Sequence, residues 1–157
     1  MDRRLRLNLL LMLLVGMLGL AVWLSHPDRP PPLTGVEPAS VTRIEISDLS
    51  GRHILLQRRE GTWYLGDRRA NQTRVAQLLR ICTTPSLERF TAPASLRPYG
   101  LDPAPIRLRL NDTTLDFGDT DPINGWRYVR IGTRVHLIGD GFRHHLSAPP
   151  EAWLEPR

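Results

Sequence analysis

Apolar and polar residues follow three patterns along this chain, and the first is a continuous apolar run from Leu7 to Leu24. Only Asn8 and two glycines interrupt it. As a helix, these eighteen residues would rise about 1.5 Å each and extend roughly 27 Å, close to the hydrocarbon thickness of a bilayer. Backbone amides in lipid must be bonded within the segment, so a helix is the only form open to the run. We therefore predict a transmembrane anchor at residues 1–25.

The charged residues around the run predict its orientation. Arg3, Arg4 and Arg6 precede it, whereas only Arg29 follows it closely. Basic residues favour the cytoplasmic side, so we expect the N-terminus in the cytoplasm and the remaining chain across the membrane. The expected location is the inner membrane, with a single pass and a periplasmic domain.

A cleaved signal peptide is the alternative for the same run. Gly19-Leu20-Ala21 offers the small residues that cleavage requires, with Val22 as the new N-terminus. However, the apolar character continues to Leu24, beyond most signal-peptide cores, and Trp23 lies where aromatic side chains meet lipid headgroups. Length and flanking residues favour the uncleaved anchor, and either form exports the rest of the chain.

The second pattern is the period-two alternation of strands that bury one face. The alternation occurs at the end of segment 41–46, where Ile44 and Ile46 share a face. Further β-rich segments follow at 53–58 and 62–65. Further strands are predicted at residues 106–110, 114–117, 127–131 and 134–138. A polar loop at 118–125 should close on Asn124-Gly125, a strong hairpin signal that places the chain at φ > 0.

The third pattern is helical. Asn71 can cap a helix because its side-chain oxygen accepts the free amides of a first turn. Val75, Leu78, Leu79 and Cys82 follow at i, i+3, i+4 and i+7 and form one apolar stripe. The stripe predicts a helix from Asn71 to Thr83, and a short second helix is expected within residues 139–146.

These elements predict an α+β fold with an N-terminal transmembrane helix. The expected domain is small, with mostly antiparallel strands packed against one main helix and a short second helix. Proline-rich composition marks residues 26–38 as a semi-rigid linker and residues 148–157 as a tail, which leaves 39–147 as the domain. Cys82 is the sole cysteine, so no intramolecular disulfide can form.

Net charge narrows the range of partners only slightly. The formal charge is +5 and every basic side chain other than histidine is an arginine. Such a small excess, spread along the chain, is weak evidence for an anionic partner. An exported domain would not normally meet nucleic acid, and no small-molecule substrate is expected.

Candidate metal and catalytic residues have simpler structural explanations. Asp119 and Asp121, with Asp116 and Asn124 nearby, could supply oxygen ligands for calcium, but a proline interrupts the series and no glutamate ends it. We favour an aspartate-rich turn whose side chains bond their own backbone, with Asp116 facing solvent.

Histidine and cysteine suggest no reaction centre either. Adjacent side chains point apart, so His144 and His145 cannot comfortably share an ion, and His53 and His136 lack partners at ligand spacing. Cys82 belongs to the apolar stripe. We predict no catalytic, cofactor-binding or metal-binding residues and no cofactor.

An aromatic and arginine patch is the candidate interaction site. Tyr128 and Arg130 alternate with Val129 and Ile131 and therefore share the other face of their strand, with Trp126 just before it. Exposed aromatic and arginine side chains are enriched at protein interfaces. The alternative is that these aromatic residues pack beneath a neighbouring loop.

Several short motifs resemble one bacterial family. They are Gly61-Thr-Trp63-Tyr-Leu65, Tyr99-Gly-Leu101-Asp-Pro103, and Phe117-Gly-Asp119 with Pro122, Asn124-Gly125 and Arg127-Tyr128-Val129. Together they resemble the family called domain of unknown function 4340, across about Val41 to Leu146. The resemblance implies an anchored extracytoplasmic domain, often found near ABC-transporter components of the gliding-motility type. It implies no catalytic residues.

The function expected from the sequence is structural or interaction work. The chain would be a single-pass envelope protein, not an enzyme, that presents a small domain to a protein partner, as an accessory component of an ABC-type transport complex. The alternative is a binding module for an anionic envelope polymer or lipid headgroup. Binding to such a polymer should weaken steeply with ionic strength, whereas a packed protein interface should not.

Overall fold

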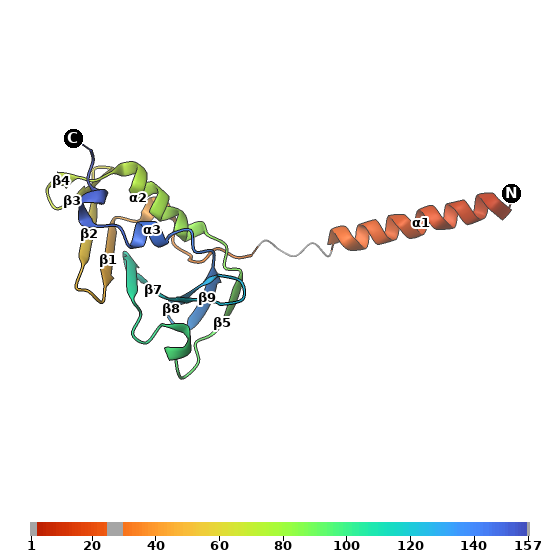
Figure 1. The fold of residues 1–157 in the computed structure, drawn as a ribbon. Coiled ribbons are helices and arrows are strands. Elements are labelled where there is room, and N and C mark those ends of the chain that lie inside the picture. Colours follow the sequence, from red (N-terminus) through yellow and green to blue (C-terminus); the bar gives the residue numbers. More distant parts are fainter. Residues whose placement is uncertain (1–2, 25–29, 157) are drawn as a thin grey trace. The chain divides into compact units, whose positions relative to one another are not determined.

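The chain consists of two structural units, Met1–Pro30 and Pro31–Arg157 (Figure 1). The computed structural model describes residues 3–24 and 30–156, and it describes the side chains of the first range from residue 8 to residue 22. The predicted anchor residues 1–2 and 25, the linker residues 26–29 and the final residue 157 lie outside the described residues.

The described residues of the first unit include the helix α1 (Arg3–Leu24), where the apolar run predicts a helix. The described side chains of α1 are all exposed, and Leu10, Met12 and Val22 have exposed fractions of 66%, 78% and 63%. Within the part of the chain whose side chains are described, no helix combines the length and the apolar character needed to cross a membrane.

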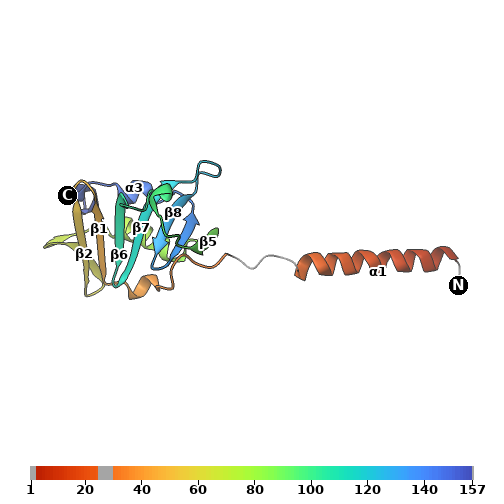
Figure 2. The ribbon, with the colours of Figure 1, turned by 90° about the horizontal axis from the view of Figure 1, so that it is seen from below.

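The second unit is a small α+β domain built on one antiparallel sheet, as predicted. The nine strands lie in the order β4-β3-β2-β1-β6-β7-β8-β9-β5. Their bounds are β1 (Arg43–Asp48), β2 (His53–Arg59), β3 (Thr62–Leu65), β4 (Arg68–Arg69), β5 (Glu88–Thr91), β6 (Ile106–Leu110), β7 (Thr113–Thr120), β8 (Arg127–Ile131) and β9 (Arg134–Ile138). Figure 2 shows β2, β1, β6, β7 and β8 side by side.

One face of this sheet forms the core with the main helix. Ile44 and Ile46 are fully buried, and their cross-strand partners include Leu56 and Leu108. The helix is α2 (Gln72–Leu79), which continues as the 3-10 helix η2 (Arg80–Thr83). Its whole predicted stripe is buried in the same cluster as the strands. The predicted cap is also confirmed, because the Asn71 side chain accepts a 3.0 Å hydrogen bond from the Arg74 amide.

The C-terminal residues differ from the expected tail. After α3 (Arg143–Leu146) the chain forms the 3-10 helix η4 (Pro150–Trp153), and Trp153 has no exposed surface. Leu154 then pairs with Ala70. Residues 148–156 therefore belong to the domain, because Trp153 buries more apolar surface in the core than a free tail would.

The linker also ends earlier than expected. Leu33 is buried, and its amide donates a 2.7 Å hydrogen bond to the carbonyl of Thr84. Pro32 pairs with Pro85 beside it, and the 3-10 helix η1 (Pro38–Ser40) leads into β1. The second half of the predicted linker is thus part of the domain, because Leu33 within the proline-rich stretch is buried in the hydrophobic core.

The predicted polar loop at 118–125 is shorter in the structure. β7 continues to Thr120 and buries Gly118, with a register shift between Phe117 and Thr120 in its pairing with β8. The turn closes through a 2.8 Å hydrogen bond from the Gly125 amide to the Asp121 carbonyl. Gly125 has φ +70°, as predicted, but Asn124 does not have a positive φ. The Asp121 carboxylate accepts the Asn124 amide instead, at 2.9 Å.

Candidate functional site

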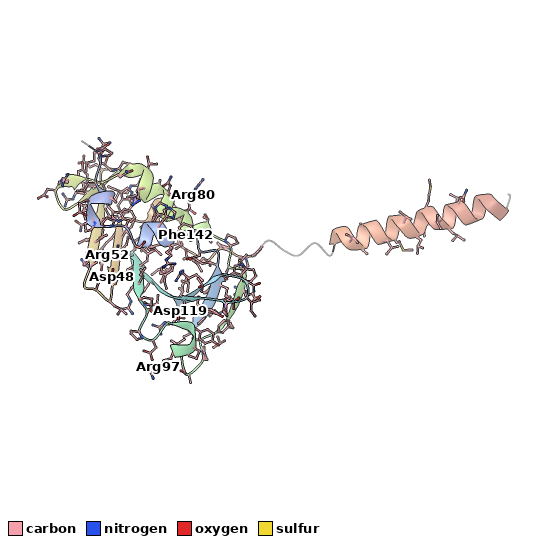
Figure 3. All side chains as sticks on the ribbon, viewed as in Figure 1. Asp48, Arg52, Arg80, Arg97, Asp119 and Phe142 are labelled. Carbon is pink, nitrogen blue, oxygen red and sulfur yellow. The ribbon has the colours of Figure 1, made fainter. Side chains whose placement is uncertain are left out.

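The face of the sheet opposite the core, called the outer face below, carries the candidate site. Side chains alternate along a strand, so Asp116, Tyr128 and Arg130 point away from the core that Leu115 and Val129 enter. Residues 96–104, called the strap below, contain the 3-10 helix η3 (Arg97–Tyr99) and lie against β7. Figure 3 labels Arg97 on the strap and Asp119 on β7.

Aromatic contacts hold the strap to the outer face, and a glycine on β7 leaves room for the strap backbone. The Tyr99 ring lies 5.4 Å from the Phe90 ring and 5.0 Å, edge-on, from the Tyr128 ring, measured between centroids. Gly118 permits close approach of the backbone, since a Cβ there would overlap the Tyr99 carbonyl oxygen and lie 2.8 Å from Leu101 Cγ. Tyr128 is therefore half-buried under the strap, which is the alternative that the sequence left open.

A pocket of about 460 Å³ opens between the strap and strands β1, β6 and β8. Its apolar lining comes from Leu49 and from strap residues that include Leu96 and Leu101. Its charged lining consists of Asp48, Asp102, Arg107 and Arg130. The pocket lining is polar over most of its area and places arginine side chains beside three leucines, in a space of the size that small ligands or peptide side chains occupy.

Asp116 fixes both arginines. Arg107 on β6 and Arg130 on β8 are its cross-strand partners on either side. Arg107 Nε donates to one carboxylate oxygen at 2.6 Å, and Arg130 donates to the other from Nη2 at 2.6 Å and from Nε at 3.2 Å. The Asp116 side chain is 4% exposed, so the expectation that it faces solvent is wrong. It is buried because the arginines of two neighbouring strands cover and neutralise it.

The ion pairs also set the charge state of Asp116. Burial alone would raise the pKa of Asp116, but the hydrogen bonds from Arg107 and Arg130 outweigh burial and hold that pKa below its usual range. The hydrogen bond to Asp116 correspondingly raises the pKa of Arg107. Asp116 and Arg107 are therefore both charged at neutral pH.

Part of each guanidinium remains available for a ligand. The Arg107 side chain is 56% exposed and the Arg130 side chain is 33% exposed. Among residues 30–156, neither Nη atom of Arg107 has a hydrogen-bond partner, nor has Nη1 of Arg130. Such N–H groups recognise planar anions, above all carboxylates, through paired hydrogen bonds.

The structure separates the three residues of the predicted interaction patch. Arg130 lines the pocket, whereas Tyr128 packs against the strap and its hydroxyl lies 3.4 Å from Asp121 Oδ1. Burial, with Asp121 nearby, raises the pKa of Tyr128. Trp126 is half-buried in the turn before β8 and does not line the pocket. The patch predicted from the sequence does not include Arg107, although the alternation of β6 already places Arg107 on the polar face of that strand.

A second charge pair, which is half-buried, supports the rim of the pocket. Asp48 and Arg52 lie next to each other (Figure 3), with 2.8 Å between Asp48 Oδ2 and Arg52 Nε. Hydrogen bonds from Ser50 and then from Arg52 lower the pKa of Asp48 to about 2. The Nη atoms of Arg52 donate to the carbonyls of Leu146 and Ala148, so the same arginine connects the C-terminal segment to the turn between β1 and β2.

Within residues 30–156, the histidines and the cysteine do not line this pocket. His144 and His145 have ring centroids 3.9 Å apart, and His53 Nε2 lies 3.9 Å from a Glu45 carboxylate oxygen. In the ranges 3–24 and 30–156, no three or more His, Cys, Asp or Glu residues are grouped so that they could hold a metal ion. Cys82 is buried, and burial raises the pKa of its thiol.

Ser86 and His136 form a pair without access to a substrate. Ser86 Oγ lies 2.8 Å from His136 Nδ1, a distance that would suit a nucleophile and its base. The exposed fractions of these residues are only 3% and 8%, and the Ser86 amide is bonded to the Pro31 carbonyl. The pair is explained as buried polar groups that satisfy each other.

Comparisons with protein-family models, with curated proteins and with solved structures find no match to this chain. Two of the motifs that carry the family resemblance nevertheless meet at the candidate site. The Tyr99–Pro103 motif supplies much of the strap, and the Phe117–Asp119 motif supplies the stretch of β7 on which the strap rests. A role of these motifs in shaping the pocket would explain their composition.

Proposed function

We propose that this chain is a single-pass inner-membrane protein that presents residues 31–156 in the periplasm as a protein-interaction domain. Its partner would be a protein of the envelope, and an ABC-type transport complex is the class that the sequence motifs favour. The domain acts by binding and not by catalysis.

The observation that carries the proposed binding role is the pocket on the outer face. Leu49, at its rim, is 66% exposed, although a leucine gains free energy when it is covered. Arg107 and Arg130 line the same pocket and are held in place by Asp116, and some of their N–H groups have no hydrogen-bond partner among residues 30–156. Apolar and arginine side chains in one preorganised concave surface are typical of the energetically important centre of a protein interface.

The membrane anchor is supported by the pattern of α1. From Leu9 to Val22 the helix is apolar on all sides, with no charged or polar side chain. A helix of that kind requires apolar surroundings, either a protein core or a lipid bilayer. An export-dependent reporter fused after Pro38 should be active, and mass spectrometry of the mature protein should recover its original N-terminal residues. A mature protein that begins at Val22 would replace the anchor by a cleaved signal peptide.

Site-specific photocross-linking tests the binding role. A photoreactive residue at Leu49 in the full-length protein should cross-link to a defined envelope protein in intact membranes. The same residue at Ile123, which is 87% exposed and does not line the pocket, is the matched control and should not yield that product. Equal products from both positions would contradict a partner site at the pocket.

Binding of an anionic polymer or headgroup is the second candidate, because Arg107 and Arg130 could also hold phosphate. Asp48 and Asp102 line the same pocket and disfavour a highly charged polyanion. Ionic strength separates the two candidates: a packed protein interface should persist at raised salt, whereas attachment to a polymer should be lost. We expect the protein cross-link from Leu49 to be retained at about 0.5 M salt, roughly three times the physiological ionic strength.

A further inference from the structure

We infer that the pocket between the strap and strands β1, β6 and β8 binds the C-terminal carboxylate of a partner segment whose last residue is apolar. The inference rests on the proposed binding role and specifies the ligand chemistry of the same site. Three features of the pocket lead to it: the geometry of its arginines, its charge balance and its apolar walls.

The arginine geometry fits a single carboxylate. Arg107 and Arg130 come from two strands that flank β7, and both use Nε to contact the same Asp116 carboxylate. Their remaining N–H groups therefore belong to two guanidiniums that are both anchored at the Asp116 carboxylate. An incoming carboxylate has two oxygens and can accept from both arginines. Since Asp116 already orders the arginine side chains, binding would cost little further conformational entropy.

The charge balance favours a ligand that carries one negative charge. Arg107 and Arg130 contribute positive charge, Asp116 offsets part of it, and the exposed Asp102 adds a further negative group. Asp48 is already paired with Arg52. The pocket is therefore close to neutral as a whole and positive only at the arginines. A phosphate-rich polymer would be repelled by the aspartates, whereas one carboxylate can be accepted at the arginines alone.

The apolar walls favour a chain terminus over an acidic side chain. Leu49, Leu96 and Leu101 line the pocket together with the arginines, within about 460 Å³. In a C-terminal residue the carboxylate and the side chain share one Cα, so an apolar side chain can contact these leucines while the carboxylate reaches the guanidiniums. A glutamate side chain would place its charge farther from any apolar group of its own. Capture of a C-terminal carboxylate is an established mode of peptide recognition.

Titration of the full-length chain, in detergent micelles and followed by NMR of the arginine Nε–H groups, tests the inference. The probe is N-acetyl-alanyl-leucine with a free carboxylate, and its C-terminal amide is the matched control. The acid should shift the Arg107 and Arg130 signals saturably, with a dissociation constant on the order of 1 mM, and the amide should bind at least about tenfold more weakly.

Variants separate the binding role of the arginine from its structural role. Arg107→Gln should weaken binding of the acid by about tenfold while Asp116 keeps both hydrogen bonds from Arg130. Arg107→Lys should restore part of the affinity, since it keeps the charge but loses the planar fork. Arg109→Gln is the matched control, because Arg109 lies two residues further along β6 and does not line the pocket. Its affinity should equal that of the original chain, and equal losses at both positions would overturn the inference.

Other ligands give decisive outcomes as well. Equal binding of the amide, or no saturable binding of the acid, would overturn the carboxylate assignment. Tighter binding of inorganic phosphate, or of vesicles that contain anionic lipid, would replace it by a phosphate or headgroup site. Tighter binding of N-acetyl-glutamate amide would assign an acidic side chain instead of a chain terminus. If these titrations fail while the Leu49 cross-link to a protein persists, the ligand class is wrong and the proposed binding role stands.

Discussion

Replacing Trp153 by alanine should destabilise the domain more than almost any other single truncation. Trp153 is the largest of the fully buried side chains and has no exposed surface. The substitution removes about 200 Å² of buried apolar area, which corresponds to about 5 kcal/mol at 25 cal/mol per Å². Residual structure in the unfolded chain reduces this to about 3–4.5 kcal/mol.

A neighbouring cation adds to this loss. The Arg74 guanidinium lies 5.5 Å from the centroid of the Trp153 ring, and such a contact contributes about 0.5–1 kcal/mol. We therefore expect Trp153→Ala to lower the free energy of unfolding by about 4 kcal/mol, within the range known for buried tryptophans. Because small domains have total stabilities of about 5–15 kcal/mol, this loss amounts to between about a quarter and four fifths of the total.

Urea unfolding of the full-length protein in mild detergent, followed by far-UV circular dichroism, measures the effect. Trp126→Ala is the matched control and should cost about 1–2 kcal/mol, since Trp126 is only half-buried. Trp153→Phe should cost less than about 1.5 kcal/mol because it keeps most of the buried volume. A loss below about 1 kcal/mol for Trp153→Ala would show that residues 148–156 are a dispensable tail and would refute the packing described for them.

The remaining predictions concern the main helix, the strap and pH. Leu79→Ala should cost about 2–5 kcal/mol in urea unfolding, whereas the exposed Gln77→Ala should be nearly neutral, and equal small effects would mean that the assigned buried face is wrong. Gly118→Ala should displace the strap and greatly increase amide hydrogen exchange there, because a Cβ would overlap the strap backbone; unchanged exchange would contradict that contact. Burial lowers the pKa of His136 and of His145 in the folded protein. The stability that depends on these two neutral histidines is fully present above their pKa in the unfolded chain, near 6.5, and is lost as pH falls through their lower pKa in the folded protein. Urea unfolding should give a lower free energy at pH 5 than at pH 7.5, and no difference between these values would contradict their burial.

Elements with a strong periodic pattern could be predicted from the sequence. The strand at 106–110 alternates without exception, and its assigned bounds agree with β6. The helix stripe and the Asn71 cap are equally local features, since neighbouring residues on one element determine both. Local signals were sufficient where one face of an element is buried in a single core.

Elements that depend on distant partners could not be predicted in the same way. β5 (Glu88–Thr91) is polar apart from Phe90, and it is a strand because it pairs with β9 at the edge of the sheet. Trp153 stands alone among prolines and polar residues, so no periodicity marks its burial. Its place in the core depends on the position of α2, which the local sequence does not encode.

The candidate site shows the same limit. Alternation places Arg107, Asp116 and Arg130 on one face, but only the register of three strands brings them into one row. Without that register, the alternation predicts that Asp116 faces solvent and gives no reason to single out Arg107. The position of the strap could not be predicted either, because it depends on the close approach of the strap backbone to Gly118, a residue distant in the sequence.

The central claim is that the outer-face pocket receives a carboxylate-bearing segment of a partner protein. Competition with the Leu49 cross-link in membranes that contain the full-length protein tests it most directly. N-acetyl-alanyl-leucine should suppress the cross-link, its C-terminal amide should leave the cross-link intact, and Arg107→Gln should weaken it while Arg109→Gln does not. A cross-link that forms equally in the presence of the acid and in the Arg107→Gln protein would contradict the claim.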